Sequence, residues 1–167
     1  SFWEYWGASI AYNFENTRIS NVRADASSLI KDQEGTRTTS SITTSVGRDT
    51  RNNLLDPSRG SKNTAAVTFA GLGGTNAFLK GIFDSGWFYP VFDVTTVHLR
   101  GRVGYATGLF DKKLPLYERY YVGGIQTVRG FGYGNAGPKD TNGEPIGGEK
   151  ELIFNAEYIF PIVAELK

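Results

Sequence analysis

Cysteine and methionine are both absent from this sequence of 167 residues. Without cysteine, the chain can form no disulfide bond and can supply neither a thiol nucleophile nor a thiolate metal ligand. Because methionine is missing even from the first position, we expect the sequence to be a piece of a longer protein. No run of about eighteen apolar residues occurs, so the sequence contains no candidate transmembrane helix.

Histidine and excess charge are also scarce. His98 is the single histidine, and 18 Lys and Arg residues nearly balance 17 Asp and Glu residues. A charge balance of this kind argues against binding of nucleic acid through a basic surface. A Ser–His–Asp triad would have to use His98, and no group of His, Cys or carboxylate residues is spaced like a metal site. We therefore expect no enzyme activity, no cofactor, no metal and no nucleic-acid partner.

Two short motif matches carry little weight. The segment "GYGNAG" at 132–137 fits the dinucleotide-binding pattern G-x-G-x-x-G. That pattern requires a helix after the glycines, whereas Pro138 follows here without helical periodicity. The segment "DTNGE" at 140–144 suggests a calcium loop but lacks the ligand spacing of an EF-hand. Both segments are better interpreted as solvated turns.

Residues typical of β-strands are abundant. The chain contains 21 glycines and 14% aromatic residues, and threonine, valine, tyrosine and phenylalanine are frequent. Within 95–108, apolar and polar residues alternate, which is the pattern of a strand with two different faces. The apolar set is Thr95, Val97, Leu99, Gly101, Val103 and Tyr105; the polar set is Thr96, His98, Arg100, Arg102, Gly104 and Ala106.

The same alternation predicts about six strands in total. It recurs clearly at 6–14 and 151–160 and more weakly at 37–48, 63–71 and 77–91. Short connections at 51–61 and 89–95 contain proline or aspartate, as turns do, while the connections at 19–35 and 109–150 are long and polar. The connection at 71–76 is short, although it falls on the side of the long loops. A meander with short turns at one end and long loops at the other is typical of outer-membrane barrels.

Charged residues on the polar faces favour a water-filled lumen. Arg100, Arg102 and Lys80 would be costly in the dry core of a soluble β-sandwich, although alternation by itself also fits such a sandwich. Aromatic residues cluster near strand ends, as in the interfacial girdle of a membrane barrel; they are Trp3, Tyr5, Trp6, Trp87, Phe88 and Tyr89. From these patterns a membrane barrel is the favoured interpretation, and a soluble sandwich is the alternative.

Several motifs resemble one family of outer-membrane proteins. The segment "VRGF" at 128–131 is preceded by "LPLYERYYVGG" at 114–124 and followed by "GPK" at 137–139. The turn "DPSRGS" at 56–61 and the strand "LIFNAEYIFPI" at 152–162 extend the similarity over nearly the whole chain. Together they resemble the BamA-type outer-membrane protein assembly factors, within the insertase superfamily that carries the VRGF motif.

The resemblance implies a fold, a location and a function. The fold is all-β, an antiparallel meander of about six strands that forms part of a transmembrane barrel of about sixteen strands. Residues 1–167 would supply roughly the seventh to twelfth strands, with the long loop 109–150 carrying VRGF. The protein would fold and insert β-barrel proteins in the bacterial outer membrane. Its partners would be unfolded client proteins, accessory lipoproteins and outer-membrane lipid, and the family also carries periplasmic POTRA domains.

Three alternative functions stay open at this stage. A two-partner secretion or autotransporter-assembly pore belongs to the same superfamily. A passive porin would lack VRGF, and a soluble β-sandwich adhesin would lack charges directed into a lumen opposite an apolar stripe.

The resemblance also implies a site. Val128, Arg129, Gly130 and Phe131 would lie at the tip of a loop that folds back into the lumen. Glu157 matches, by position, one of the lumen acids with which the motif arginine pairs. Truncating a buried charged partner typically destabilises a protein by about 3–5 kcal/mol. From the alternation we further expect Val97, Leu99, Val103, Tyr105, Leu152, Phe154 and Tyr158 to face lipid, and His98, Arg100, Arg102, Asn155 and Glu157 to face the lumen.

Overall fold

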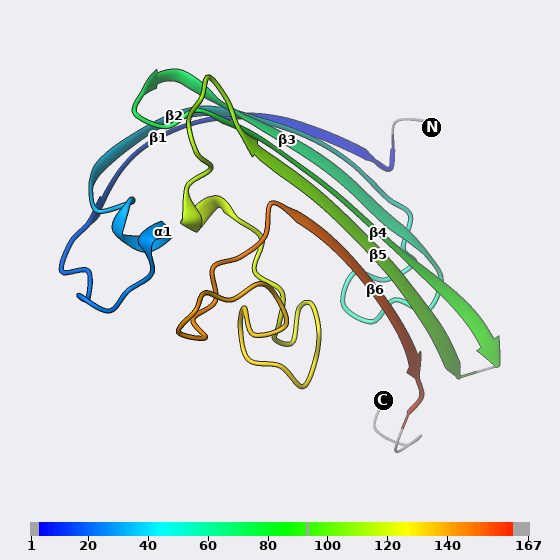
Figure 1. Ribbon diagram of the computed structural model, residues 1–167. Helices are drawn as coiled ribbons and strands as arrows, with labels where there is room; N and C mark the ends of the chain where they lie inside the picture. The colour runs from blue at the N-terminus through cyan, green and yellow to red at the C-terminus, as the bar shows by residue number, and fades with distance from the viewer. Residues whose placement is uncertain (1–3, 93, 162–167) are drawn as a thin grey trace.

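Six antiparallel strands form a single curved sheet (Figure 1). The computed structural model describes residues 4–92 and 94–161. Each strand pairs with the next one along the chain, which confirms the expected all-β meander of about six strands. The strands are β1 (Trp6–Ile19), β2 (Gly35–Asp49), β3 (Gly60–Gly74), β4 (Phe78–Phe92), β5 (Thr95–Gly108) and β6 (Lys150–Ile159).

Strands β1, β2 and β3 are longer than the expected ranges 6–14, 37–48 and 63–71. Strand β3 extends beyond the expected 63–71 at both ends, because its glycine-rich end carries no apolar or polar signal that alternation can detect. Strand β4 continues to Phe92, so most of the expected turn at 89–95 is strand. Pro90 lies opposite Thr96, and the pairing register shifts between Pro90 and Phe92. A proline has no N–H to donate to the ladder, which suits it to such an irregularity.

The two faces of the sheet differ in chemistry. Large apolar side chains stand exposed on the convex face; in β5 and β6 they include Leu99, Val103, Tyr105, Leu152, Phe154 and Tyr158. The charged residues Lys80, Arg100 and Arg102 contact acids on the concave side. Both long connections also lie on the concave side (Figure 1). This arrangement is the expected one for a wall between lipid and a wet lumen.

The aromatic residues near the strand ends do not all share one face. Trp87 and Tyr89 are exposed and stack with their ring centroids 6.2 Å apart. Phe88 instead stacks on the His98 ring at 4.1 Å, on the concave side. The expected girdle is therefore wrong for Phe88, because alternation turns successive side chains to opposite faces. Tyr5 and Trp6 are exposed, and Trp3 lies outside the described residues.

The buried core lies between the concave face and the β5–β6 loop. Its members are Ala70, Phe78, Ala106, Leu114 and Tyr120, and Ile82 packs against them. The first three belong to neighbouring strands, whereas Leu114 and Tyr120 come from the loop. Sheet and loop therefore share one core, so the loop is a packed part of the fold.

Two short helical turns, which the sequence did not predict, occur in the long connections. The helix α1 (Ser28–Lys31) lies between β1 and β2, and the 3-10 turn η1 (Leu116–Glu118) lies between β5 and β6. Among the described residues, no helix has the length and apolar character that a membrane crossing requires.

Candidate functional site

The β5–β6 loop is anchored to the sheet through Tyr120. The Tyr120 side chain is 7% exposed, and its hydroxyl donates a hydrogen bond of 2.6 Å to the Gly81 carbonyl of β4. Burial raises the pKa of this hydroxyl. A Cβ atom at Gly104 would lie 2.7 Å from Cζ of the Tyr120 ring. Glycine is thus required at position 104, because any side chain there would displace the tyrosine.

Polar contacts fix the η1 turn close to the same anchor. Lys80 Nζ on β4 lies 3.2 Å from Glu118 Oε2. The Asn76 amide in the β3–β4 turn donates to the Tyr117 hydroxyl at 2.6 Å. The backbone N–H of Leu116 donates to Gln33 Oε1 at 3.1 Å. The η1 turn is therefore held by Lys80 of β4, by Asn76 of the β3–β4 turn and by Gln33 of the β1–β2 connection.

The glycine-rich segment that begins at Gly123 reaches further along the concave face. Gly123 has a φ of +134°, a backbone conformation that other residues rarely adopt. Its N–H donates to the Thr127 hydroxyl at 2.8 Å and closes a tight turn. The carbonyl of Gln126 accepts from Arg100 Nη1 at 3.1 Å, and that of Thr127 accepts from Asn155 Nδ2 at 2.9 Å. Side chains of β5 and β6 therefore donate hydrogen bonds to the loop just before the VRGF motif.

The VRGF motif continues this line of contacts. Arg129 Nη2 lies 2.6 Å from Glu157 Oε1 on β6, the partner that the family resemblance implies. The Arg129 side chain is nevertheless 65% exposed and that of Glu157 26% exposed. The Arg129–Glu157 ion pair is therefore partly exposed to solvent. We expected Arg129 to be shielded from bulk water, and the described residues do not shield it.

The other motif residues make fewer contacts. Val128 is half-buried, and Gly130 has a φ of +89°, which favours glycine at that turn. Phe131 is exposed.

A charge network lies on the strands beneath the loop. Asp84 accepts two hydrogen bonds from Arg100, at 2.9 and 2.5 Å. Arg102 lies 3.4 Å from Asp84 and 3.5 Å from the nearly buried Glu151. A bidentate arginine–carboxylate pair fixes both the position and the angle of the guanidinium. Arg100 can therefore present its remaining donor to the loop in a defined direction.

His98 belongs to the same concave surface. Its Nδ1 lies 3.4 Å from Glu157 Oε2, and its ring stacks on Phe88. This position matches the expected lining of the lumen.

Several residues of the site escaped the sequence reasoning. No site role was expected for Asp84, Glu118 or Tyr120, although each is central to the contacts with the loop. Glu118 and Tyr120 lie in the segment 114–124 that carries the family resemblance. The alternation within β4 places Asp84 on the same face as Lys80 and so contained a usable signal. For Glu118 and Tyr120, which lie outside any strand, no periodic pattern was available.

These features together define a class of protein. An antiparallel wall with an apolar convex face and a loop bound to a charged concave face is part of a transmembrane β-barrel. Residues 1–167 match the Omp85 superfamily domain. The chain belongs to the Omp85 superfamily.

Comparison with individual proteins supports the same assignment. Over 166 residues the chain is 27% identical to the outer membrane protein assembly factor BamA of Nitratidesulfovibrio vulgaris, covering 98% of this chain and 21% of that protein. Over 121 residues it is 35% identical to the protein of the same name from Neisseria meningitidis serogroup B, covering 70% of this chain and 15% of that protein. The chain thus spans about a fifth or less of the length of these curated relatives.

A solved structure shares the fold. The crystal structure of BamA from Haemophilus ducreyi lacking POTRA domains 1-3 superposes with a TM-score of 0.76. The match covers 96% of this chain and 35% of that chain, at 16% sequence identity. These comparisons confirm the resemblance to BamA-type proteins and the assignment of the sheet to a barrel wall.

Proposed function

We propose that the protein containing this chain folds and inserts β-barrel proteins into the bacterial outer membrane. The match of the entire chain to the Omp85 superfamily domain is the observation that carries this proposal. Relatives from two bacteria, both named as outer membrane protein assembly factors, support it. The exposed apolar stripe on the convex face fits a location in the outer membrane.

The position of the chain within the barrel is part of the proposal. Among the described residues, β1 pairs only with β2 and β6 only with β5, so each outer edge has backbone groups without a strand partner. Such edges are not tolerated in lipid, since each unsatisfied group there costs several kcal/mol. The sheet would therefore have further strands on both sides. The family resemblance implies that residues 1–167 form roughly strands seven to twelve of a barrel of about sixteen strands.

The loop 109–150 would work as a brace inside the lumen. It contacts β4 through Tyr120, β5 through Arg100, and β6 through Asn155 and Glu157. Contacts with three neighbouring strands oppose flattening of the wall between them. A wall of fixed curvature on this side of the barrel would leave the rest of the barrel free to open for a client strand.

The partners follow from this function. Unfolded outer-membrane proteins would be the clients, and outer-membrane lipid would surround the convex face. Accessory lipoproteins would complete the assembly machinery. The process involves no covalent chemistry, because folding and insertion change only non-covalent contacts.

Reconstitution of the complete protein tests the proposal. A urea-unfolded β-barrel client would be diluted into liposomes with and without the protein, and its folding followed by the gel shift of heat-modifiable barrels. We expect faster folding with the protein than with empty liposomes or with liposomes that contain a porin. Export of a dedicated partner without any effect on client folding would instead identify a two-partner secretion pore.

A further inference from the structure

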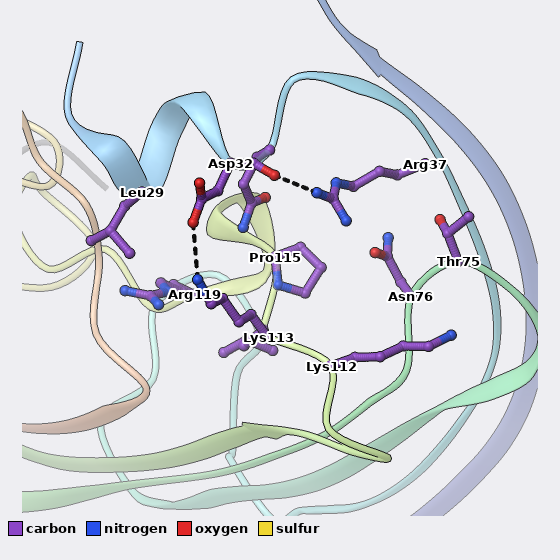
Figure 2. A pocket seen from close by; sticks show the side chains of 11 residues that line it. Leu29, Asp32, Arg37, Thr75, Asn76, Lys112, Lys113, Pro115 and Arg119 are labelled. Atoms are coloured by element: carbon purple, nitrogen blue, oxygen red, sulfur yellow. Dashed lines mark hydrogen bonds and ion pairs between the residues drawn. The ribbon is translucent and has the colours of Figure 1, made fainter.

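A cavity lies at the loop end of the sheet, away from the VRGF motif. Its volume is about 330 Å³. The walls come from the end of α1, the start of β2, the β3–β4 turn and the first part of the β5–β6 loop. Figure 2 shows Arg37, Asn76 and Pro115 around this space. Among the described residues, no contact of the VRGF motif involves this lining, although Asn76 and Gln33 of the lining also hold the η1 turn.

Positive charge in the cavity lining exceeds negative charge. The charged lining residues are Asp32, Arg37, Lys112, Lys113 and Arg119. Asp32 pairs with Lys113 at 2.9 Å. Arg37 donates to the backbone carbonyl of Asp32 at 2.6 Å, and Lys112 reaches only the Gly74 carbonyl, at 3.5 Å. Within the described part of the chain, neither Arg37 nor Lys112 has a carboxylate partner.

Arg119 is only weakly neutralised. Its Nη2 lies 3.6 Å from Glu149 Oε1, which is too long for a hydrogen bond. The lining therefore contains two cations, Arg37 and Lys112, that have no carboxylate partner among the described residues, and a third, Arg119, whose ion pair is long.

Buried donors without acceptors line the same space. The Nε atoms of Arg37 and Arg119 are buried and have no hydrogen-bond partner among the described residues. A buried donor without a partner is destabilising, so these groups indicate that an acceptor is missing.

We propose that this cavity binds a phosphate group. The free groups are donors and cations, so the ligand must be an anion that accepts hydrogen bonds at several oxygens. A guanidinium matches phosphate oxygens with paired N–H donors, and an ammonium adds a point charge. The volume is at the lower end of the range for small-molecule pockets. It therefore suits a phosphate together with one attached sugar-sized group.

The phosphate has two possible sources with the same chemistry. One is a soluble phosphate or phosphate ester that enters from the loop end of the barrel. The other is a phosphorylated headgroup of the surrounding outer-membrane lipid. The experiment below separates them.

Phosphorus NMR of the complete protein tests the site. The protein in detergent micelles would be titrated with inorganic phosphate at about 0.1 M NaCl, where screening suppresses weak surface attraction. We expect saturable binding that weakens about tenfold in Arg37→Gln, because a charged hydrogen-bond donor is lost. Arg59→Gln is the matched control, since Arg59 is exposed in the β2–β3 turn and does not line the cavity. The gel shift of heat-modifiable barrels reports folding, and the exposed Lys112→Gln gives a second variant if Arg37→Gln misfolds.

A second series, with lipid A or its dephosphorylated form in the micelles, identifies the source. Competition by phosphorylated lipid A alone assigns the site to a lipid headgroup, and absence of competition assigns it to a soluble phosphate. The proposal is overturned if phosphate does not bind saturably, or if Arg59→Gln weakens binding as much as Arg37→Gln. A structure of the complete protein with a carboxylate from another segment inside the cavity would overturn it as well.

Discussion

Gly104 is a residue at which the barrel wall and the loop approach closely. A Cβ atom there would lie 2.7 Å from the Tyr120 ring and 2.8 Å from Glu151 Cγ. The backbone of Gly104 is ordinary strand, so the glycine is needed for space and not for an unusual φ. Its importance can therefore be tested without confusion from backbone strain.

We expect Gly104→Ala to destabilise the packing of the loop by about 1–3 kcal/mol, the usual range for overpacking. Limited proteolysis within 109–150 of the complete protein should become faster. Gly101→Ala is the matched control, because its Cβ would face Phe154 at an ordinary distance of 3.4 Å on the convex side. Equal protease resistance of the two variants would contradict the account of this contact.

The Arg129–Glu157 ion pair should contribute less to stability than a buried ion pair would. Because its side chain is 65% exposed, the ion pair with Glu157 should contribute only about 0–1 kcal/mol to stability. A double-mutant cycle with Arg129→Ala and Glu157→Gln, read from urea unfolding of the complete protein, measures this coupling. A coupling energy of about 3–5 kcal/mol would show instead that the pair is buried in the complete barrel.

At the scale of the strand, β5 and β6 have opposite chemistry on their two faces. Cross-strand pairs on the concave face join Arg100 to Asn155 and His98 to Glu157. On the convex face Val103 lies opposite Leu152. A shift of the register by one residue would move every one of these side chains to the other face.

Single cysteines should report this facing directly. In the complete protein in membranes, we expect a lipophilic maleimide to react at Leu99→Cys and Val103→Cys. A hydrophilic maleimide should prefer Arg100→Cys and Arg102→Cys. The reverse labelling pattern would mean that the faces have been assigned the wrong way round.

The strands were largely predictable from sequence because alternation is a local property. In β5, each position between Thr95 and Tyr105 carries its own signal, and the predicted and observed bounds agree. The ends of β3 were missed because glycine fits either face. The facing of Phe88 was missed because an aromatic residue near a strand end was assigned to the girdle without regard to alternation.

The site was only partly predictable. The contact between Arg129 and Glu157 was expected from a family resemblance and from the face on which Glu157 lies. The contact between Tyr120 and Gly104 depends on where a long loop packs, and loop residues carry no periodic pattern. The basic cavity is built from three separate stretches of sequence, 29–37, 75–76 and 112–119, and only the fold brings them together.

At the scale of the molecule, the sheet formed by residues 4–92 and 94–161 has two free edges and an apolar convex face. Free strand edges in water template association with other strands. We expect the 167-residue chain, produced alone, to associate or aggregate in buffer rather than to form a closed barrel in detergent. Light scattering coupled to size exclusion measures this. A stable soluble monomer with dispersed amide signals would favour a β-sandwich over a barrel wall.

The central claim is that this sheet is a section of barrel wall with the VRGF loop held on its lumen side. A structure of the complete protein in lipid nanodiscs tests it most directly. The account predicts a further strand paired to the free edge of β1 and another to that of β6, with Arg129 paired to Glu157 inside the lumen. A structure in which either edge stays unpaired within the membrane, or in which the loop lies outside the barrel, would contradict it.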